Sequence, residues 1–212
     1  MARTPKITNQ QILEAAREVF FQKGFSGSTL EIAQRAGISE ASIFKRFTTK
    51  EDLFFAAMGI PDTPPWVNEL EGLCGKGDLK QNLVHICLQI LEFYRDIFPR
   101  IMMLRSRGKA LPEMRGQNAK PIRDLKILMS FLEFEMNQGR LRPCDPQTLA
   151  HVIMGALMNY VMLEQIPPLE ALPIDLLAAE AHTSALTSLT AIALVENLVE
   201  TVWQGIAPHP KS

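Results

Sequence analysis

Residues 28–47 constrain the fold of this chain more than any other stretch, because their pattern predicts two short helices joined by a tight turn. Ser28 followed by Glu31 fits a capping box at the start of the first helix, and Gly37 can end that helix. Ser39 can then cap a second helix. The sequence therefore predicts a helix-turn-helix unit at this point.

The residues on either side of this unit also follow a helical pattern. Thr8 and Gln11 form a capping box that begins a helix, and Gly24 ends it. Thr49 caps a further helix whose first turn is acidic. We therefore expect a compact helical domain over residues 5–60. The chain is then interrupted by Pro61, Pro64 and Pro65.

The remainder of the chain, residues 61–212, also predicts helices. An apolar stripe runs from residue 79 to 98 and is expected to stop at Pro99. Further helices are expected over 121–137, from Pro146 onward and over 194–206. Alternating strand patterns are nearly absent. The expected fold class is all-α, with an N-terminal three-helix domain and a larger helical domain.

Charge is distributed unevenly along the chain although the net charge is only −1. Residues 1–50 carry eight Lys or Arg and four Glu, a balance of +4, which leaves −5 for the rest. A basic head on an acidic body is consistent with a nucleic-acid partner for the head alone.

The sequence gives no indication of a metal site, a disulfide framework, a membrane span or a signal peptide. Cys74, Cys87 and Cys144 are widely spaced and form no C-x-x-C pair, so neither a zinc site nor a disulfide framework is indicated. No cofactor or metal is expected. Uninterrupted apolar runs of about 18 residues are absent, and so is the apolar core of a signal peptide. We therefore expect a cytoplasmic protein with no membrane partner.

The predicted helix-turn-helix has the residues that DNA recognition requires. Ala33 and Gly37 are small where the two helices approach each other, and Ile38, Ile43 and Phe47 can anchor the second helix. The side chains left facing outward on the second helix are those of Glu40, Ala41, Ser42, Lys45 and Arg46. A helix presented in this way can enter the major groove of DNA.

Three side chains have the clearest chemistry for binding a duplex. Lys45 can donate to guanine O6 or N7, and Glu40 can accept from cytosine N4. Lys50 lies beside a helix N-terminus, and this combination suits a phosphate. A helical hairpin in an unrelated all-α protein is the competing interpretation of the motif.

At these residues the chain resembles the TetR family of transcriptional regulators. The resemblance covers residues 5–60. It is carried by Ile12, Ala15, Ala16, Phe20 and Gly24, by residues 32–33 and 36–39, by residues 43–47 and by residues 50–54. It implies a homodimer in which each head reads half of a near-palindromic operator. It also implies that helices over about 146–165 and 189–206 pair across the two-fold axis, and that a ligand bound in the body releases the DNA.

The resemblance also implies which residues contact DNA. These are Ser28, Thr29, Ser39, Glu40, Ala41, Ser42, Phe44, Lys45, Arg46 and Lys50. Ser28 and Thr29 match positions that bind phosphate. Two departures from the family pattern stand out. Phe44 replaces the usual Tyr and so lacks a phenol hydroxyl, and the loop before Ser28 is one residue short.

The body contains many Met and aromatic residues, and Met suits adaptable apolar pockets. Candidate ligand-binding residues are Trp66, Phe93, Tyr94, Phe98, Met102, Phe131, Phe134 and Met158. Taken singly, each fits core packing more simply, and the pocket is implied only by the family resemblance. The helix over 149–162 is apolar on two faces, which independently indicates an interface.

Two other classes of function remain open at this point. One is a DNA-binding protein that responds to no ligand, which a filled body would favour. The other is a helical enzyme. His85, His151, His182 and His209 are scattered, and no nucleophile arrangement, metal spacing or phosphate loop occurs. We therefore expect a sequence-specific, ligand-released repressor and not an enzyme.

Overall fold

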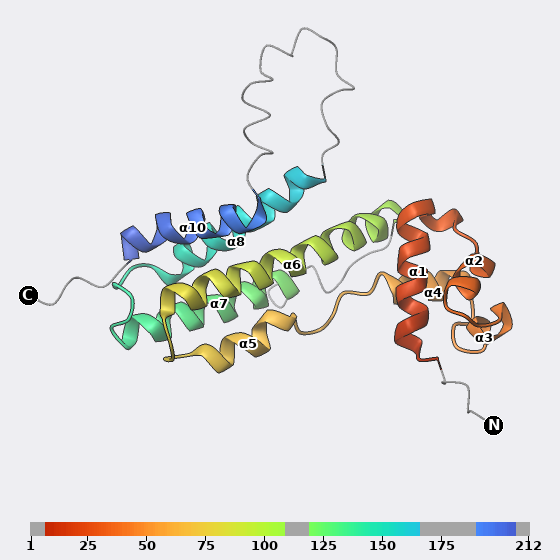
Figure 1. The fold of residues 1–212 in the computed structure, drawn as a ribbon, viewed down its shortest axis with the longest axis horizontal. Helices are drawn as coiled ribbons and strands as arrows, with labels where there is room; N and C mark the ends of the chain where they lie inside the picture. Colours follow the sequence, from red (N-terminus) through yellow and green to blue (C-terminus); the bar gives the residue numbers. More distant parts are fainter. Residues whose placement is uncertain (1–6, 109–118, 166–189, 207–212) are drawn as a thin grey trace, which may run out of the picture. The chain divides into compact units, whose positions relative to one another are not determined.

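The structure, a computed structural model, describes residues 7–108, 119–165 and 190–206. All regular elements in these ranges are helical, which confirms the expected fold class (Figure 1). The helices are α1 (Asn9–Lys23), α2 (Thr29–Arg35), α3 (Glu40–Phe44), α4 (Lys50–Ala57), α5 (Pro65–Leu73), α6 (Leu79–Ser106), α7 (Lys120–Asn137), α8 (Pro146–Glu164) and α10 (Ala191–Ile206), with a short 3₁₀ turn η1 (Gly24–Ser26). Residues 5, 6 and 189 of the expected boundaries lie outside the described ranges.

The chain divides into two compact units. The first consists of Met1–Pro61 together with Pro99–Ala110, and the second of Asp62–Phe98 together with Leu111–Ser212. The end of α6 therefore belongs to the first unit, whereas the sequence pattern grouped it with the body. The leading segment of the first unit ends at Pro61 in this division.

The expectation that Pro99 ends a helix is wrong, since α6 continues through it to Ser106. A proline inside a helix removes one backbone hydrogen bond and costs about 3 kcal/mol. Buried side chains on both sides of Pro99 offset this cost, namely Ile97, Ile101 and Leu104. Arg100 adds a hydrogen bond from Nη1 to the carbonyl oxygen of Gly59 at 3.2 Å, within the first unit.

The first unit has an aromatic and aliphatic core built from α1, α2, α3 and α4. Phe20 and Phe54 are almost fully buried and meet edge to face, with ring centroids 5.1 Å apart. The predicted caps of α1 by Thr8 and α4 by Thr49 are present, each with a reciprocal side-chain bond. This core holds α2 and α3 in place.

The expected capping box at Ser28 and Glu31 is only half correct. Ser28 is the N-cap of α2, and its hydroxyl oxygen accepts from the backbone N–H of Leu30. Glu31 instead pairs with Lys23 of α1 at 2.6 Å. A lysine at the end of α1 lies close enough to attract this carboxylate away from its own helix start.

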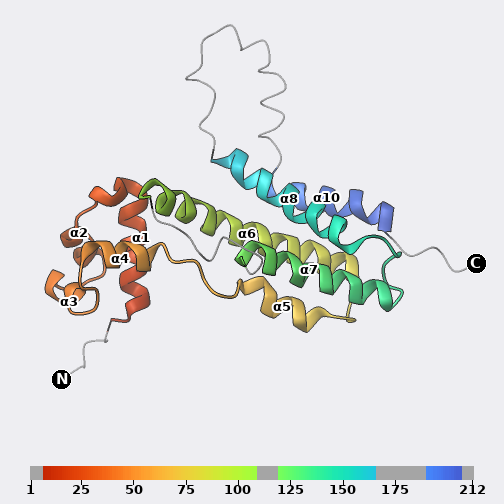
Figure 2. The same cartoon turned by 180° about the vertical axis from the view of Figure 1, so that it is seen from behind.

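The second unit is a bundle of α5, the Leu79–Phe98 part of α6, α7, α8 and α10. Helices α8 and α10 lie side by side (Figures 1 and 2), and α7 packs against α8 and α5. Asp145 caps α8 as predicted, accepting from the backbone N–H of Thr148 at 2.8 Å. The core is aliphatic with a few aromatic side chains, including Trp66 and Phe131.

Candidate nucleic-acid interface and effector site

The turn between α2 and α3 is built as the sequence predicts. Gly37 has φ of +68°, a left-handed conformation that residues with a Cβ rarely adopt. The N–H of Ile38 donates to the carbonyl of Ala33 at 2.9 Å, and that of Gly37 to Gln34 at 3.1 Å. These two bonds form a Schellman motif, which ends α2 and sets the path of the chain into α3.

One buried side chain and one cap position α3. Ser39 is its N-cap and accepts from the backbone N–H of Ser42 at 3.3 Å. The Ser39 and Ser42 hydroxyl oxygens are also 2.8 Å apart, within hydrogen-bond distance. Ile43 is fully buried. Regular helix ends at Phe44, but the N–H of Phe47 still bonds to the carbonyl of Ile43 at 2.9 Å.

The outer surface of α3 and of the turn after it is exposed and basic. Ala41, Phe44, Lys45 and Arg46 are all exposed. Arg46 donates from Nη1 to Asn9 Oδ1 at 3.2 Å, which leaves its other N–H groups available. The side chain of Lys45 makes no hydrogen bond or ion pair with any described residue, so its ammonium can reach a partner outside the chain.

Lys50, at the first position of α4, has a neighbour that sequence reasoning missed. Its Nζ lies 5.0 Å from the centroid of the Phe25 ring, and the guanidinium of Arg107 lies 4.0 Å from the same centroid. Arg107 is distant in sequence but belongs to the first unit. Such cation–π contacts stabilise by about 0.5–1 kcal/mol at exposed sites.

The Thr29 and Glu40 side chains bind each other. The Thr29 hydroxyl donates to Glu40 Oε1, which joins α2 directly to α3. Both residues are half-buried. No signal in the sequence indicated this contact, because the two residues are separated by the turn.

Other carboxylates of the first unit are paired away from α3. Glu31 pairs with Lys23, and Glu18 pairs with Arg35 at 3.0 Å. These pairs link α1 to α2. Glu40 is therefore the acidic residue that lies on α3 itself.

The structure distributes the eight candidate ligand residues over different environments. Trp66, Tyr94 and Phe131 are buried in the core of the second unit. Phe93, Phe98 and Met158 are half-buried and pack against that core. Phe134 and Met102 are exposed, and Met102 belongs to the first unit. The eight residues therefore do not line one common site.

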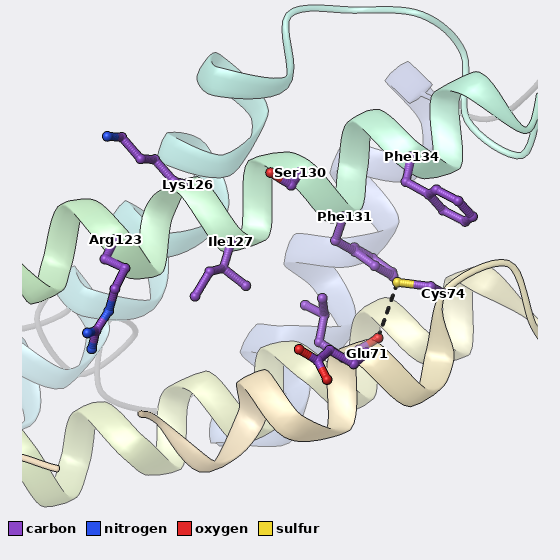
Figure 3. A pocket seen from close by; sticks show the side chains of 9 residues that line it. Glu71, Cys74, Arg123, Lys126, Ile127, Ser130, Phe131 and Phe134 are labelled. Carbon is purple, nitrogen blue, oxygen red and sulfur yellow. Dashed lines mark hydrogen bonds between the residues drawn. The ribbon is translucent and has the colours of Figure 1, made fainter. Parts of the chain in front are cut away.

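A cavity of about 450 Å³ lies between α5 and α7 (Figure 3). Phe131 and Phe134 line it, and they are the two candidate residues that do so. The other apolar lining residues are Leu70, Cys74 and Ile127. In Figure 3, Ile127 and Phe131 point from α7 toward α5, whereas Lys126 points away from it. The cavity can accommodate a small, largely apolar molecule.

The core of the second unit contains polar atoms without partners. Trp66 Nε1 is fully buried and has no hydrogen-bond acceptor. Asp124 Oδ1 is buried without a hydrogen-bond donor, although it lies 4.0 Å from Arg123 Nε. Burial raises the pKa of this carboxyl to about 6. Asp124 lies on the same face of α7 as Leu128 and Phe131, so helical periodicity could have identified it as buried. Buried polar atoms without a hydrogen bond call for a physical explanation.

Residues 7–108, 119–165 and 190–206 contain no cluster of three or more His, Cys, Asp or Glu side chains suited to holding a metal ion. Among the helices over these ranges, none combines the length and apolarity that a membrane crossing requires.

The first unit thus has the fold of a helix-turn-helix transcriptional regulator, with the exposed basic residues Lys45 and Arg46 directly after α3. The sequence profile described as "Bacterial regulatory proteins, tetR family" matches residues 12–57. The chain is 37% identical over 157 residues to YvkB of Bacillus subtilis, named as an uncharacterized HTH-type transcriptional regulator, covering 72% of this chain and 80% of that protein. The chain belongs to the TetR family, which confirms the resemblance inferred from its residues.

Full-length similarity extends through the body. The HTH-type transcriptional regulator RutR of Escherichia coli K12 is 28% identical over 224 residues, covering 98% of this chain and 94% of RutR. A solved structure described as a TetR-family regulator from Mesorhizobium loti has a TM-score of 0.61 at 19% identity, covering 94% of this chain and 96% of that one. The similarity in fold therefore includes both units.

Proposed function

We propose that this protein is a sequence-specific repressor that leaves its operator when a small molecule binds in the second unit. The observation that carries the proposal is α3, a helix anchored by Ile43 and followed directly by Lys45, whose exposed side chain has no partner among the described residues. A short helix held this way fits the major groove. In this proposal the protein acts in the cytoplasm, where its DNA target is found.

The contacts with DNA fall into two groups in this proposal. Glu40, Ala41, Ser42 and Lys45 face base edges, and Phe44 touches a thymine methyl or a sugar. Phosphate is bound from Ser28, Ser39, Arg46 and Lys50 and from the N-terminus of α2. Base contacts set the sequence preference, while phosphate contacts set affinity and position.

A second copy of the chain is the proposed partner at α8 and α10. Val152 and Met162 of α8 are 48% and 47% exposed, and Ile192 of α10 is 59% exposed. A surface cavity of about 380 Å³ lies between the two helices, with Leu149 and Val202 among its lining. Apolar surface of this kind normally marks an interface. Pairing of these helices would place two heads on one duplex.

The cavity between α5 and α7 supports a small-molecule effector, because it is of ligand size and most of its surface is apolar. Its lining also includes Glu71, Arg123, Lys126 and Ser130. A largely apolar compound fits it best. A DNA-binding protein that responds to no ligand is the second candidate. It is favoured by the burial of Trp66, Tyr94 and Phe131 in a filled core.

Selection of bound duplexes from a random pool tests the proposed function with the full chain. We expect enrichment of one near-palindromic site with two equivalent half-sites. A library of small apolar compounds is then screened for release of that duplex. Failure to enrich any sequence would refute sequence-specific binding, and enrichment without any releasing compound would favour the ligand-independent candidate.

A further inference from the structure

We propose that Thr29 is a positioning residue that holds the Glu40 carboxylate for reading a C·G base pair in each half-site. The proposal rests on the proposed function, because it requires that α3 enters the major groove. It assigns to Thr29 a role other than the phosphate contact implied by the family resemblance.

The position of the two side chains supports this assignment. Glu40 is the first residue of α3, directly after the N-cap Ser39, and Thr29 is the first residue of α2. The Thr29 hydroxyl donates to Glu40 Oε1 across the turn. A threonine has a restricted χ1, so its hydroxyl is a stiff support for the longer glutamate side chain.

The hydroxyl of Thr29 has one hydrogen, and this hydrogen is donated to Glu40 in the hydrogen bond. While this bond is present, Thr29 Oγ1 has only lone pairs to offer, and these cannot bind a phosphate oxygen. The Glu40 carboxylate keeps a second oxygen, Oε2, that can still accept. The bond therefore removes a phosphate donor and orients a base-reading acceptor.

A carboxylate on the reading helix weakens binding to DNA in general, because it repels phosphates. Such a carboxylate can nevertheless discriminate between bases. Cytosine presents an amino donor at N4 in the major groove, whereas thymine O4 and guanine O6 and N7 are acceptors. Glu40 is therefore favourable opposite cytosine and unfavourable opposite those edges, provided that its orientation is held.

The test compares the base preference of variants at every position of the selected site. Thr29→Val keeps the shape of the side chain but loses the hydroxyl, and Thr29→Ser keeps the hydroxyl. Glu40→Gln adds an amide that can pair with adenine N6 and N7. Thr48→Val is the matched control, since Thr48 is exposed and its side chain makes no hydrogen bond with any residue that the structure describes. Competition titrations give the preference for each variant.

We expect Thr29→Val to lower the preference for C·G about tenfold at one position per half-site and to leave the other positions unchanged. Thr29→Ser and Thr48→Val should keep the original preference. Glu40→Gln should shift that same position toward A·T. Circular dichroism and thermal melting of each variant establish that it is folded.

Three results would overturn the proposal while leaving the proposed function intact. These are an unchanged preference in Thr29→Val, an equal loss at all positions, and a Glu40→Gln variant with no change at any single position. If the wild-type protein itself selects no site, the proposed function fails instead. The two failures are therefore distinguishable.

Discussion

Lys45 and Lys50 illustrate how two residues of the same type differ in surroundings. Lys45 projects from the end of α3 without a partner among the described residues, whereas Lys50 starts α4 and lies over the Phe25 ring. The first is free to adopt the geometry of a base edge. The second stands at a helix N-terminus, and in the proposed function it binds a phosphate there.

Lys45→Ala is expected to reduce discrimination between the selected site and a scrambled duplex, by about 1–3 kcal/mol. Lys50→Ala is expected to weaken both duplexes alike and to lower the salt dependence of binding by about one unit of slope. Fluorescence anisotropy at several salt concentrations measures both effects. Equal losses on the two duplexes for Lys45→Ala would refute its role in base reading.

The raised pKa of Asp124 leads us to expect that the stability of the protein depends on pH. Burial raises its pKa from 3.8 to about 6, so the folded protein binds a proton more readily than the unfolded chain. Stability should therefore fall as the pH rises from about 4 to 6, and this penalty is fully present at pH 7.

Asp124→Asn removes this penalty and should raise stability at pH 7 by about 1–2 kcal/mol relative to the wild type. Urea unfolding at pH 4.5 and pH 7 measures the difference. Exposed Glu133→Gln on the same helix is the control and should show little change at either pH. A wild-type stability that rises over this pH range would contradict the assignment.

At the scale of elements, local signals predicted the helix starts and long-range packing decided the exceptions. Thr8, Thr49 and Asp145 cap helices as expected, because a cap depends on residues only a few positions away. The continuation of α6 through Pro99 could not be predicted from nearby residues in this way. Its cost is offset by buried neighbours whose packing no local pattern reveals.

The same distinction applies to the candidate site. The anchoring of α3 by Ile43 and the turn at Gly37 followed from spacing. The Thr29–Glu40 bond joins side chains on either side of a turn, and Arg107 reaches Phe25 from a distant part of the chain. Such contacts depend on tertiary structure, so the sequence pattern did not indicate them.

The cap of α4 offers a direct test at this scale. Thr49→Ala removes a side chain that accepts from the backbone N–H of Asp52 at 3.0 Å. We expect a loss of about 1 kcal/mol in the free energy of unfolding. Thr48→Ala changes the neighbouring exposed residue and is the control. Equal stabilities of the two variants in urea unfolding would show that the cap contributes nothing.

For the whole molecule, the proposed assembly depends on apolar surface that a single chain leaves exposed on α8 and α10. Sedimentation of the wild-type protein is expected to give twice the 23.8 kDa chain mass. Val152→Glu should shift the species toward the single-chain mass, because a charge would be buried in the interface. Met102→Glu, at an exposed apolar residue of the first unit, should leave the dimer intact. A wild-type monomer at micromolar concentration would contradict the proposal.

Sequence-specific binding by paired heads is the central claim, and one competition titration tests it most directly. The wild-type protein is bound to a labelled selected duplex at physiological salt and displaced by unlabelled selected or scrambled duplex. We predict that the selected duplex competes at least about 10³-fold better. A ratio near one would contradict the claim, because phosphate contacts alone would then account for all binding.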